Sequence, residues 1–242
     1  MTAKHIKVAS ACFGGAIDAA FSASLLNLAS ACAQKGVGLS WHFHDGDALI
    51  ARARAQGVAA FLADPAPTHL LMADADLAFA PEQVFRLLDA DVDFAAAAYP
   101  LKAIDWNRID RAAKGGHGVP AAAYYYALEW KNADQVQTRG EFAEVKYVAT
   151  GFILLRRSAL ARLVRAYGEL AFAAPAGGRD RTALFDPLID ARSGQYLAEG
   201  YALCRRWTDI GGEIWVDVKS RLGHIGAAPL QGDFFSQLEP AS

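Results

Sequence analysis

Two aspartates separated by one residue, Asp74 and Asp76, stand directly after the apolar run Leu70-Leu71-Met72. The run is short for a helix and predicts a buried strand. In an open α/β sheet, ligands bind just beyond the carboxyl ends of the strands. Carboxylates this close repel each other unless a cation lies between them, and Mg²⁺ and Mn²⁺ prefer carboxylate oxygens. The pair therefore indicates a divalent metal that carries a phosphate; on spacing alone, two solvated aspartates that begin a turn before Pro81 are an equal alternative.

The first hundred residues must position this pair, and they alternate predicted strands with predicted helices. Strands are expected over residues 6–12, 37–43, the run before the aspartates, and 92–99; helices are expected over residues 17–34, 47–62 and 81–88. Gly36 is expected to end the first helix, Asp47 to cap the second, and Asp64-Pro65 to end it. This alternation predicts a parallel sheet with helices on both faces.

The second half of the chain has a less regular pattern. The expected elements are a hairpin or mobile loop within 103–140, a strand over 145–155, a helix over 158–167 capped by Ser158, a flexible loop over 173–181, a helix over 196–209 and a strand over 213–218. The last residues, from about Gln231, are expected to fray or cross the surface. No internal repeat or convincing linker is visible, so one domain is predicted for residues 1–242.

Composition restricts the partners and the cellular location. The net charge is −2 with acids and bases spread along 242 residues, which argues against a nucleic-acid partner. No apolar run approaches the ~18 residues of a transmembrane segment, although peripheral membrane contact is compatible with the sequence, and no signal peptide is evident. The cysteines Cys12, Cys32 and Cys204 are odd in number and form no CxxC pair, so reduced thiols in a cytoplasmic protein are expected. Cys32 and Cys204 lie in helical patterns and are predicted core residues.

Four segments occur together in an order that chance would rarely supply. They are Asp74-Ala75-Asp76, Tyr99-Pro100-Leu101-Lys102, a stretch over 148–157 with Thr150-Gly151-Phe152, and a late stretch over 184–224 that contains Glu199 and ends in Leu222-Gly223-His224. Together they resemble a bacterial or phage-type branch of the nucleotide-sugar glycosyltransferases with the GT-A fold, over about residues 5–226. The resemblance implies a single GT-A-like α/β domain with a mostly parallel central sheet flanked by helices. It would comprise a Rossmann-like nucleotide-binding half (about 1–100), an acceptor-side half (about 101–226) and a C-terminal tail (227–242).

The resemblance also implies roles for particular residues. Asp74 and Asp76 match the Asp-x-Asp that holds Mn²⁺ or Mg²⁺ and the donor diphosphate, and His224 matches a late histidine that often adds a metal ligand. The residues implied around the nucleotide are Ala9, Ser10, Ala11 and Cys12 after the first strand, Asp45 and Asp47 after the second, and Arg52 and Arg54 on the following helix within reach of a phosphate. Gly151 and Phe152 match the turn that lines the acceptor side, and Glu199 lies where this family often places an acidic pair.

One departure from the family pattern concerns the catalytic base. In inverting transfer, a carboxylate takes the proton of the attacking acceptor hydroxyl, and the family segment commonly reads Glu-Asp with Asp as the base. This chain has Glu199-Gly200 instead. Glu199 is the best candidate for the base; alternatively, Asp186 reaches the site, or the protein is retaining or weakly active. Inverting and retaining mechanisms both stay open.

The function expected from these residues and this resemblance is metal-dependent transfer of a sugar from a nucleoside-diphosphate sugar, with UDP favoured, to an unknown acceptor. A catalytically degenerate nucleotide-sugar-binding module is the alternative that Gly200 motivates. A nucleotidyltransferase is less favoured, because Cys12-Phe13-Gly14-Gly15 lacks the basic residues usual in such a turn. His224 could instead bond backbone near Gly226, and Lys102 is as compatible with solvent as with substrate. The oligomeric state is not predicted.

Overall fold

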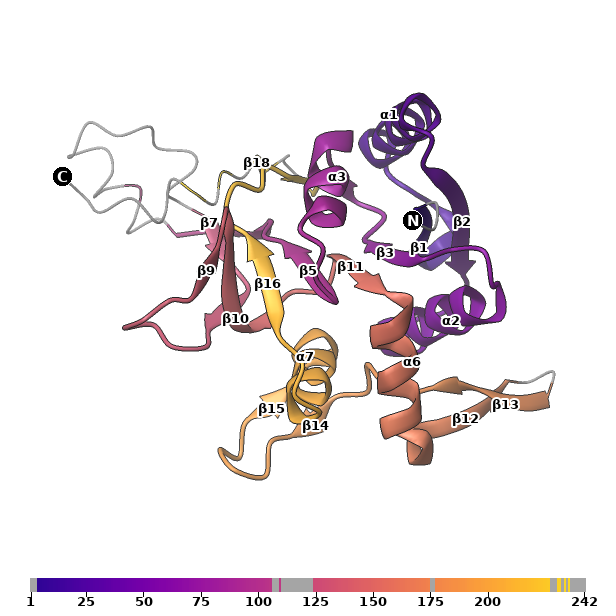
Figure 1. Ribbon diagram of the computed structural model, residues 1–242, viewed down its shortest axis with the longest axis vertical. Helices are drawn as coiled ribbons and strands as arrows, with labels where there is room; N and C mark the ends of the chain where they lie inside the picture. Colours follow the sequence, from indigo (N-terminus) through magenta and orange to yellow (C-terminus); the bar gives the residue numbers. More distant parts are fainter. Residues whose placement is uncertain are drawn as a thin grey trace.

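A twisted sheet runs through the centre of the molecule (Figure 1). The computed structural model describes residues 4–105, 109, 124–174, 177–226, 230–231, 233 and 235. Within them the main sheet has the order β2-β1-β3-β11-β5-β16-β10-β8, with β9 beside β10. Only β11 and β10 run against the other strands of this sheet. The strands of the main sheet are β1 (His5–Cys12), β2 (Gly38–Asp45), β3 (His69–Ala73), β5 (Phe94–Ala97), β8 (Leu128–Trp130), β9 (Thr138–Arg139), β10 (Phe142–Val148), β11 (Phe152–Arg156) and β16 (Ile214–Asp217).

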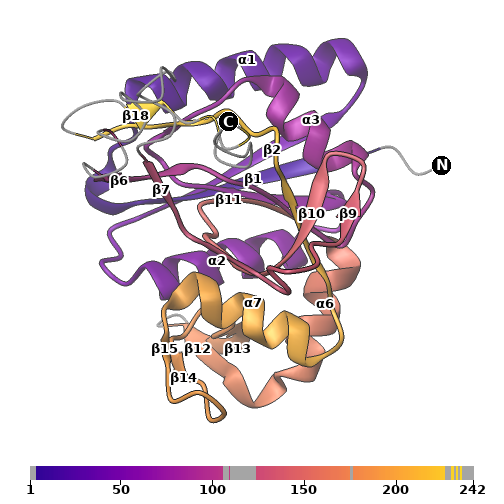
Figure 2. The same ribbon diagram turned by 90° about the vertical axis from the view of Figure 1, so that its left-hand side faces the viewer.

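Helices cover both faces of this sheet (Figure 2). The layer of α1 and α3 packs on one face, and the layer of α2, α6 and α7 packs on the other. Alternate side chains of β3 supply both cores, with Leu70 and Met72 on the α2 side and Leu71 and Ala73 on the α1 side. The predicted α/β fold, with a mostly parallel sheet flanked by helices, is confirmed. The helices are α1 (Ala19–Lys35), α2 (Ile50–Ala63), α3 (Pro81–Asp89), α6 (Arg157–Ala166) and α7 (Glu199–Asp209), with 3₁₀ turns η1 (Phe13–Gly15) and η2 (Gly168–Leu170).

The ends of α1 follow local sequence signals. The Asp18 carboxylate accepts a hydrogen bond from the backbone N–H of Ala20 at 2.7 Å and caps the helix. Gly36 ends the helix in the left-handed region, with φ of 65°, as predicted. The capping prediction for α2 is wrong, because Leu49 is the N-cap, and Asp47 instead accepts from the backbone N–H of Leu49 at 2.9 Å in the preceding turn.

The predicted single strand over 145–155 is in fact two strands. β10 ends at Val148 and β11 begins at Phe152, and β5 and β16 lie between them in the sheet. Both strands are buried on both faces, so their apolar residues form one continuous run without an alternation that would mark the break. The turn between them, Ala149-Thr150-Gly151, is part of the candidate site.

Three other boundaries differ from the predictions. The loop expected over 173–181 is largely a hairpin of β12 (Ala171–Ala174) and β13 (Gly177–Thr182). The N-cap of α6 is Arg156, so Ser158 lies inside the helix. α7 begins at Glu199, because Tyr196 and Leu197 form β15 and pair with β14 (Leu188–Ile189). Of the hairpin or loop predicted within 103–140, residues 106–108 and 110–123 lie outside the described residues.

A small three-stranded sheet brings the end of the chain to the aspartate pair. In it, β17 (Gly223–His224) pairs with β4 (Leu77–Ala78) and with β18 (Leu230–Gln231). Beside it, β6 (Pro100–Ile104) pairs with β7 (Tyr124–Tyr126). Apart from β18, the predicted tail over 227–242 is almost wholly outside the described residues.

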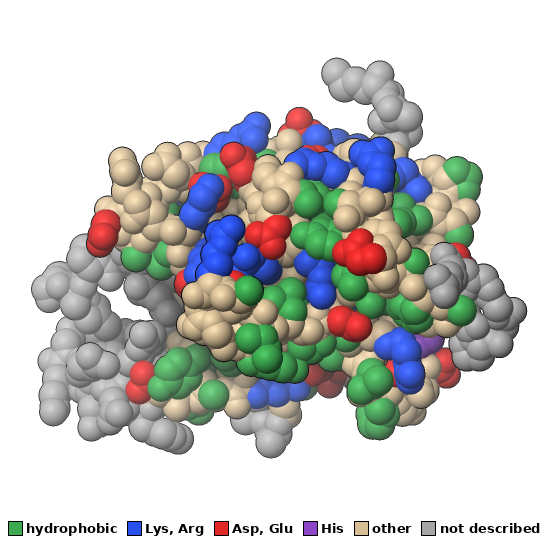
Figure 3. All heavy atoms as spheres, turned by 90° about the horizontal axis from the view of Figure 1, so that it is seen from below, with side chains coloured by type: hydrophobic (Ala, Val, Ile, Leu, Met, Phe, Trp, Pro, Cys, Tyr) green, Lys and Arg blue, Asp and Glu red, His purple; other side chains and the backbone are tan. Residues whose placement is uncertain are grey.

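Several sequence predictions about burial and the surface can be compared with the structure. Cys32 and Cys204 are buried in α1 and α7, as predicted, and Cys12 is buried at the end of β1. In the part of the chain that the structure describes, no helix has the length and apolar character needed to cross a bilayer. On the face in Figure 3, basic, acidic and hydrophobic side chains are interspersed. That mixture agrees with a net charge close to zero.

Candidate functional site

A small cavity lies where the carboxyl ends of β1 and β3 meet the N-terminal half of α2. Its lining consists of Ala9, Ser10, Ala11, His42, Ala53, Arg54, Gly57, Met72, Ala73 and Asp74. Two buried polar atoms in this lining, Ser10 Oγ and His42 Nε2, have no hydrogen-bond partner among the described residues. An unpaired buried polar group costs about 1–3 kcal/mol. These two atoms therefore lack the partners that buried polar groups usually have, and burial lowers the pKa of His42, which keeps its ring neutral.

Arg54 enters this site because of its position on α2. It lies four residues before Val58 and seven before Phe61, so all three share the helix face that packs on the sheet. Gly57 lets this face approach closely, since a Cβ there would lie 3.0 Å from the Cβ of Ala9. Arg54 is only 8% exposed as a result. The periodicity of α2 could have identified Arg54, and not Arg52, as the arginine of the site.

The guanidinium of Arg54 joins three segments of the chain. Nη2 donates to Asp74 Oδ1 at 2.9 Å, and Nη1 lies 3.3 Å from Glu199 Oε1 and donates to Thr150 Oγ1. Burial alone would lower the pKa of Arg54, but Asp74 and other negative neighbours raise it, so the side chain stays cationic. A buried cation thus lies between Asp74 and Glu199, the first residue of α7.

Asp74 is held against the turn between β10 and β11. Its backbone N–H donates to the carbonyl of Gly151 at 2.8 Å, and the N–H of Gly151 donates to the hydroxyl of Tyr99 at 3.1 Å. A Cβ at Gly151 would collide with both the Asp74 carboxylate and the Tyr99 hydroxyl. Burial raises the pKa of Tyr99 far above its usual range, and the charge of Asp74 adds to this effect, so the phenol stays neutral. Tyr99 was not among the predicted site residues.

Asp76 has cationic or polar partners on both carboxylate oxygens. Lys102 Nζ lies 2.6 Å from Oδ2, and His224 Nε2 lies 3.5 Å from Oδ1. Burial would raise the pKa of Asp76, but the contacts with His224 and Lys102 outweigh burial and lower it to about 2. The backbone holds this arrangement, because the N–H of Ile225 donates to the carbonyl of Asp76 at 2.8 Å. Lys102, left open by sequence, therefore lies at the site.

The three predicted metal ligands do not form one cluster in the structure. Asp76 and His224 lie together, whereas Asp74 pairs with Arg54, and the described residues contain no cluster of three or more His, Cys, Asp or Glu side chains arranged for a metal. The chemistry of the donor set nevertheless fits a divalent cation. His224 Nδ1 lies 2.8 Å from the carbonyl of Pro100. A carbonyl only accepts, so Nδ1 carries a proton, and Nε2 is the ring nitrogen that faces Asp76.

Several other predicted residues lie apart from this cluster. Arg52 is on the exposed face of α2 and donates to Asp47 at 2.7 and 2.9 Å. This pairing lowers the pKa of Asp47 to about 2. Asp45 is exposed at the end of β2 opposite Cys12, whose thiol pKa is raised by burial and then by Asp45. Cys12 does not line the cavity that holds Ser10.

On the predicted acceptor side, Gly151 lies at the site and Phe152 does not. Phe152 is fully buried in the α1-side core, with its ring centroid 4.9 Å from that of Phe79. Asp186 is exposed, and its backbone carbonyl accepts from Arg206 Nη1 at 2.8 Å. Its neighbour Phe185 does reach the site, because its ring centroid lies 5.9 Å from the guanidinium carbon of Arg54.

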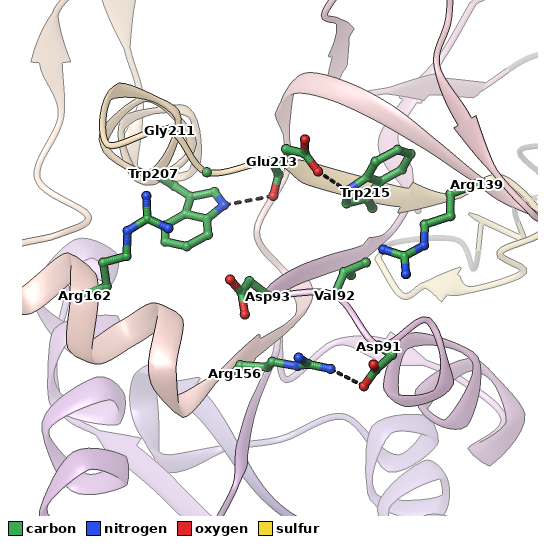
Figure 4. A pocket seen from close by; sticks show the side chains of 11 residues that line it. Asp91, Val92, Asp93, Arg139, Arg156, Arg162, Trp207, Gly211, Glu213 and Trp215 are labelled. Carbon is green, nitrogen blue, oxygen red and sulfur yellow. Dashed lines mark hydrogen bonds and ion pairs between the residues drawn. The ribbon is translucent and has the colours of Figure 1, made fainter.

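A larger cleft lies at the opposite end of the strands, where β5 and β16 begin (Figure 4). Arg162 lies over the ring of Trp207, and Arg156 pairs with Asp91. Arg139 and Asp93 also face this cleft, so its lining mixes both signs of charge. None of the predicted site residues lines it. The cavity at the carboxyl ends of the strands is smaller, but the unpaired buried atoms and Asp74 line it.

Comparisons with known proteins give a likeness of fold. No protein-family model and no curated protein matches the chain. Among solved structures, A197 from STIV is similar with 11% identity and a TM-score of 0.52, over 92% of this chain and 86% of that one. The 4-diphosphocytidyl-2C-methyl-D-erythritol synthase from Anaerococcus prevotii has 11% identity, a TM-score of 0.38, and coverage of 71% and 80%. A glycosyltransferase involved in the glycosylation of the major capsid of PBCV-1 has 10% identity, a TM-score of 0.34, and coverage of 70% and 68%.

Proposed function

We propose that this protein transfers a sugar from a nucleoside-diphosphate sugar to an acceptor. The observation that carries the proposal is the cavity at the strand ends, where two unpaired buried polar atoms, Ser10 Oγ and His42 Nε2, lie beside the cation of Arg54 and the carboxylate of Asp74. A nucleoside needs polar partners within an enclosed site, and its diphosphate needs cations. The site offers both at the place where α/β sheets bind ligands. The cavity itself, of about 10 Å³, has room for about one water, so the nucleoside would lie over its mouth.

Each residue of the site has a role in this proposal. Arg54 would face the diphosphate oxygens, while Ser10 and His42 would contact the nucleoside. Asp74 and Asp76 with His224 would hold Mn²⁺ or Mg²⁺. When bound, this ion would stabilise the negative charge that develops on the departing phosphate.

Glu199 is the proposed base that takes the proton of the acceptor hydroxyl. It is the first residue of α7 and it reaches the cluster through Arg54. Gly200 stands where the resembled family commonly has an aspartate, and it lies close to Thr150. A Cβ at Gly200 would lie 2.9 Å from Thr150 Oγ1, so a larger side chain there would displace Thr150 from Arg54.

The decisive test is thermal unfolding of the chain with UDP, GDP, CDP and their sugars, each with and without Mn²⁺. A ligand at 100 times its dissociation constant stabilises the folded state by ~2.7 kcal/mol. We expect a shift with one nucleotide, UDP first, that depends on Mn²⁺ and disappears in the double variant Asp74→Asn/Asp76→Asn. Ser10→Ala should weaken the nucleotide shift without changing its dependence on Mn²⁺. A folded protein that responds to no nucleotide would refute the proposal.

A nucleotide-sugar-binding module without catalysis is the second candidate. The ion pair of Glu199 with Arg54 favours it, because a carboxylate that positions a cation need not be a base. The two candidates differ in turnover. Sugar transfer or donor hydrolysis by the wild type that is lost in Glu199→Gln, with donor binding retained, would support the transferase; donor binding without any turnover would support the module.

A further inference from the structure

The ammonium of Lys102 lies against the carboxylate of Asp76. Its Nζ lies 2.6 Å from Asp76 Oδ2, while the other carboxylate oxygen faces His224. The three side chains come from separate segments, since Asp76 follows β3, Lys102 lies in β6 and His224 lies in β17. Tertiary structure, and no local sequence pattern, therefore brings the ammonium of Lys102 to Asp76.

The aliphatic stem of Lys102 packs against a glycine. Gly226, two residues after His224, lies against it, and a Cβ at this glycine would be 3.2 Å from Lys102 Cδ and 3.6 Å from Cε and Cγ. The absence of a side chain at Gly226 leaves room for the aliphatic stem to pass. The end of the side chain is still accessible, since Lys102 is 42% exposed and Asp76 is 39% exposed. The ammonium can thus leave for solvent without unpacking the core.

We infer that Lys102 is a resident counterion of Asp76 that a divalent cation must displace, so that this lysine sets the affinity of the metal site. The inference rests on the proposed function, which assigns Asp76 and His224 to the metal. A carboxylate that already holds an ammonium gives up part of its electrostatic attraction to a second cation. The two positive charges also repel each other for as long as both stay near Asp76. Metal binding therefore includes breaking the Lys102 ion pair.

The first test is a titration of the whole chain with Mn²⁺, with and without UDP. The concentration of free Mn²⁺ is measured by electron paramagnetic resonance. We expect Lys102→Met to bind Mn²⁺ about fivefold more tightly than the wild type, the size expected for loss of a half-exposed competing ion pair. Lys102→Arg, which retains the charge, should bind close to the wild-type value. Lys146→Met is the matched control, because Lys146 is also 42% exposed and lies 2.6 Å from the carboxylate of Glu129, away from the site.

The outcomes separate the inference from the proposal on which it rests. Equal Mn²⁺ dissociation constants for wild type and Lys102→Met overturn the inference and leave the metal site intact. If neither protein binds Mn²⁺, or if Asp76→Asn binds it as well as the wild type does, the proposed metal site is itself wrong. An equal gain in Lys146→Met would show a general effect of net charge and would also overturn the inference.

A second measurement follows Lys102 in the unmutated chain, and a variant is needed only to assign its signal. Reductive methylation with ¹³C labels each lysine amine and keeps its charge, and Lys102→Arg identifies the signal of Lys102 by its loss. Addition of diamagnetic Mg²⁺ should shift the Lys102 signal toward that of a solvated amine, while the Lys146 signal stays unchanged. A Lys102 signal that does not move at saturating Mg²⁺ would show that the ammonium remains in place and would overturn the inference.

Discussion

Replacement of Arg54 by Met should destabilise the fold to an extent that the local geometry predicts. The substitution keeps an apolar stem over Phe185 but removes the cation shared by Asp74 and Glu199. Removing one partner of a fully buried ion pair costs ~3–5 kcal/mol. The side chains of Asp74 and Glu199 are 29% and 30% exposed, so solvent screens part of the loss. We therefore expect a loss of ~1–3 kcal/mol in the free energy of unfolding.

Differential scanning calorimetry can measure this loss. Unfolding entropy scales with chain length, so 242 residues give ~0.5 kcal/mol/K, and the expected fall in Tm is ~2–6 °C. Adding Glu199→Gln to the Arg54→Met variant should recover part of the loss, because it removes one of the two unpaired carboxylates. Arg52→Met is the matched control on the exposed face of the same helix and should lower Tm by less than Arg54→Met, because the Arg52 side chain is 53% exposed and solvent screens its pair with Asp47. The reasoning is refuted if Arg54→Met melts within about 1 °C of the wild type, or if the double variant is no more stable than Arg54→Met.

Three further predictions concern pH, the turn at Asp74 and the end of α2. Burial, with nearby cations, lowers the pKa of His69 to about 4. The unfolded chain then binds a proton that the folded chain does not, so stability should fall by up to ~3 kcal/mol between about pH 6.5 and pH 4. Urea unfolding across this range should show the slope in the wild type, and an equal slope in His69→Gln would contradict the assignment. Gly151→Ala should abolish the nucleotide-induced rise in Tm by displacing the Asp74 carboxylate, whereas Gly168→Ala, whose Cβ would meet nothing within 4 Å, should retain it. Arg157 donates to several backbone carbonyls at and beyond the end of α2, so Arg157→Met should cost ~1.5–3 kcal/mol in urea unfolding, and an unchanged midpoint would refute this.

The part of the fold that was predicted correctly is the part with local signals. The strands and helices of the first hundred residues lie close to their expected positions, because Gly36 supplies a helix end and Pro81 a helix start within the sequence itself. The second half was predicted less well. The apolar run over 145–155 contains two strands whose neighbours are distant in sequence, and its continuous burial hides the turn at Gly151.

At the candidate site, too, some features follow from the sequence and others only from the tertiary structure. The sequence by itself determined that Asp74 and Asp76 follow a buried strand, because a short apolar run that ends in carboxylates has to leave the core at that point. Tertiary structure alone decided their partners. Asp74 pairs with Arg54, and Asp76 pairs with Lys102 and lies beside His224 across sequence separations that no local pattern encodes. The physical reason is that hydrophobic patterning specifies which residues avoid water, whereas the partner of a charged group depends on which segments the packed sheet brings within a few ångströms of it.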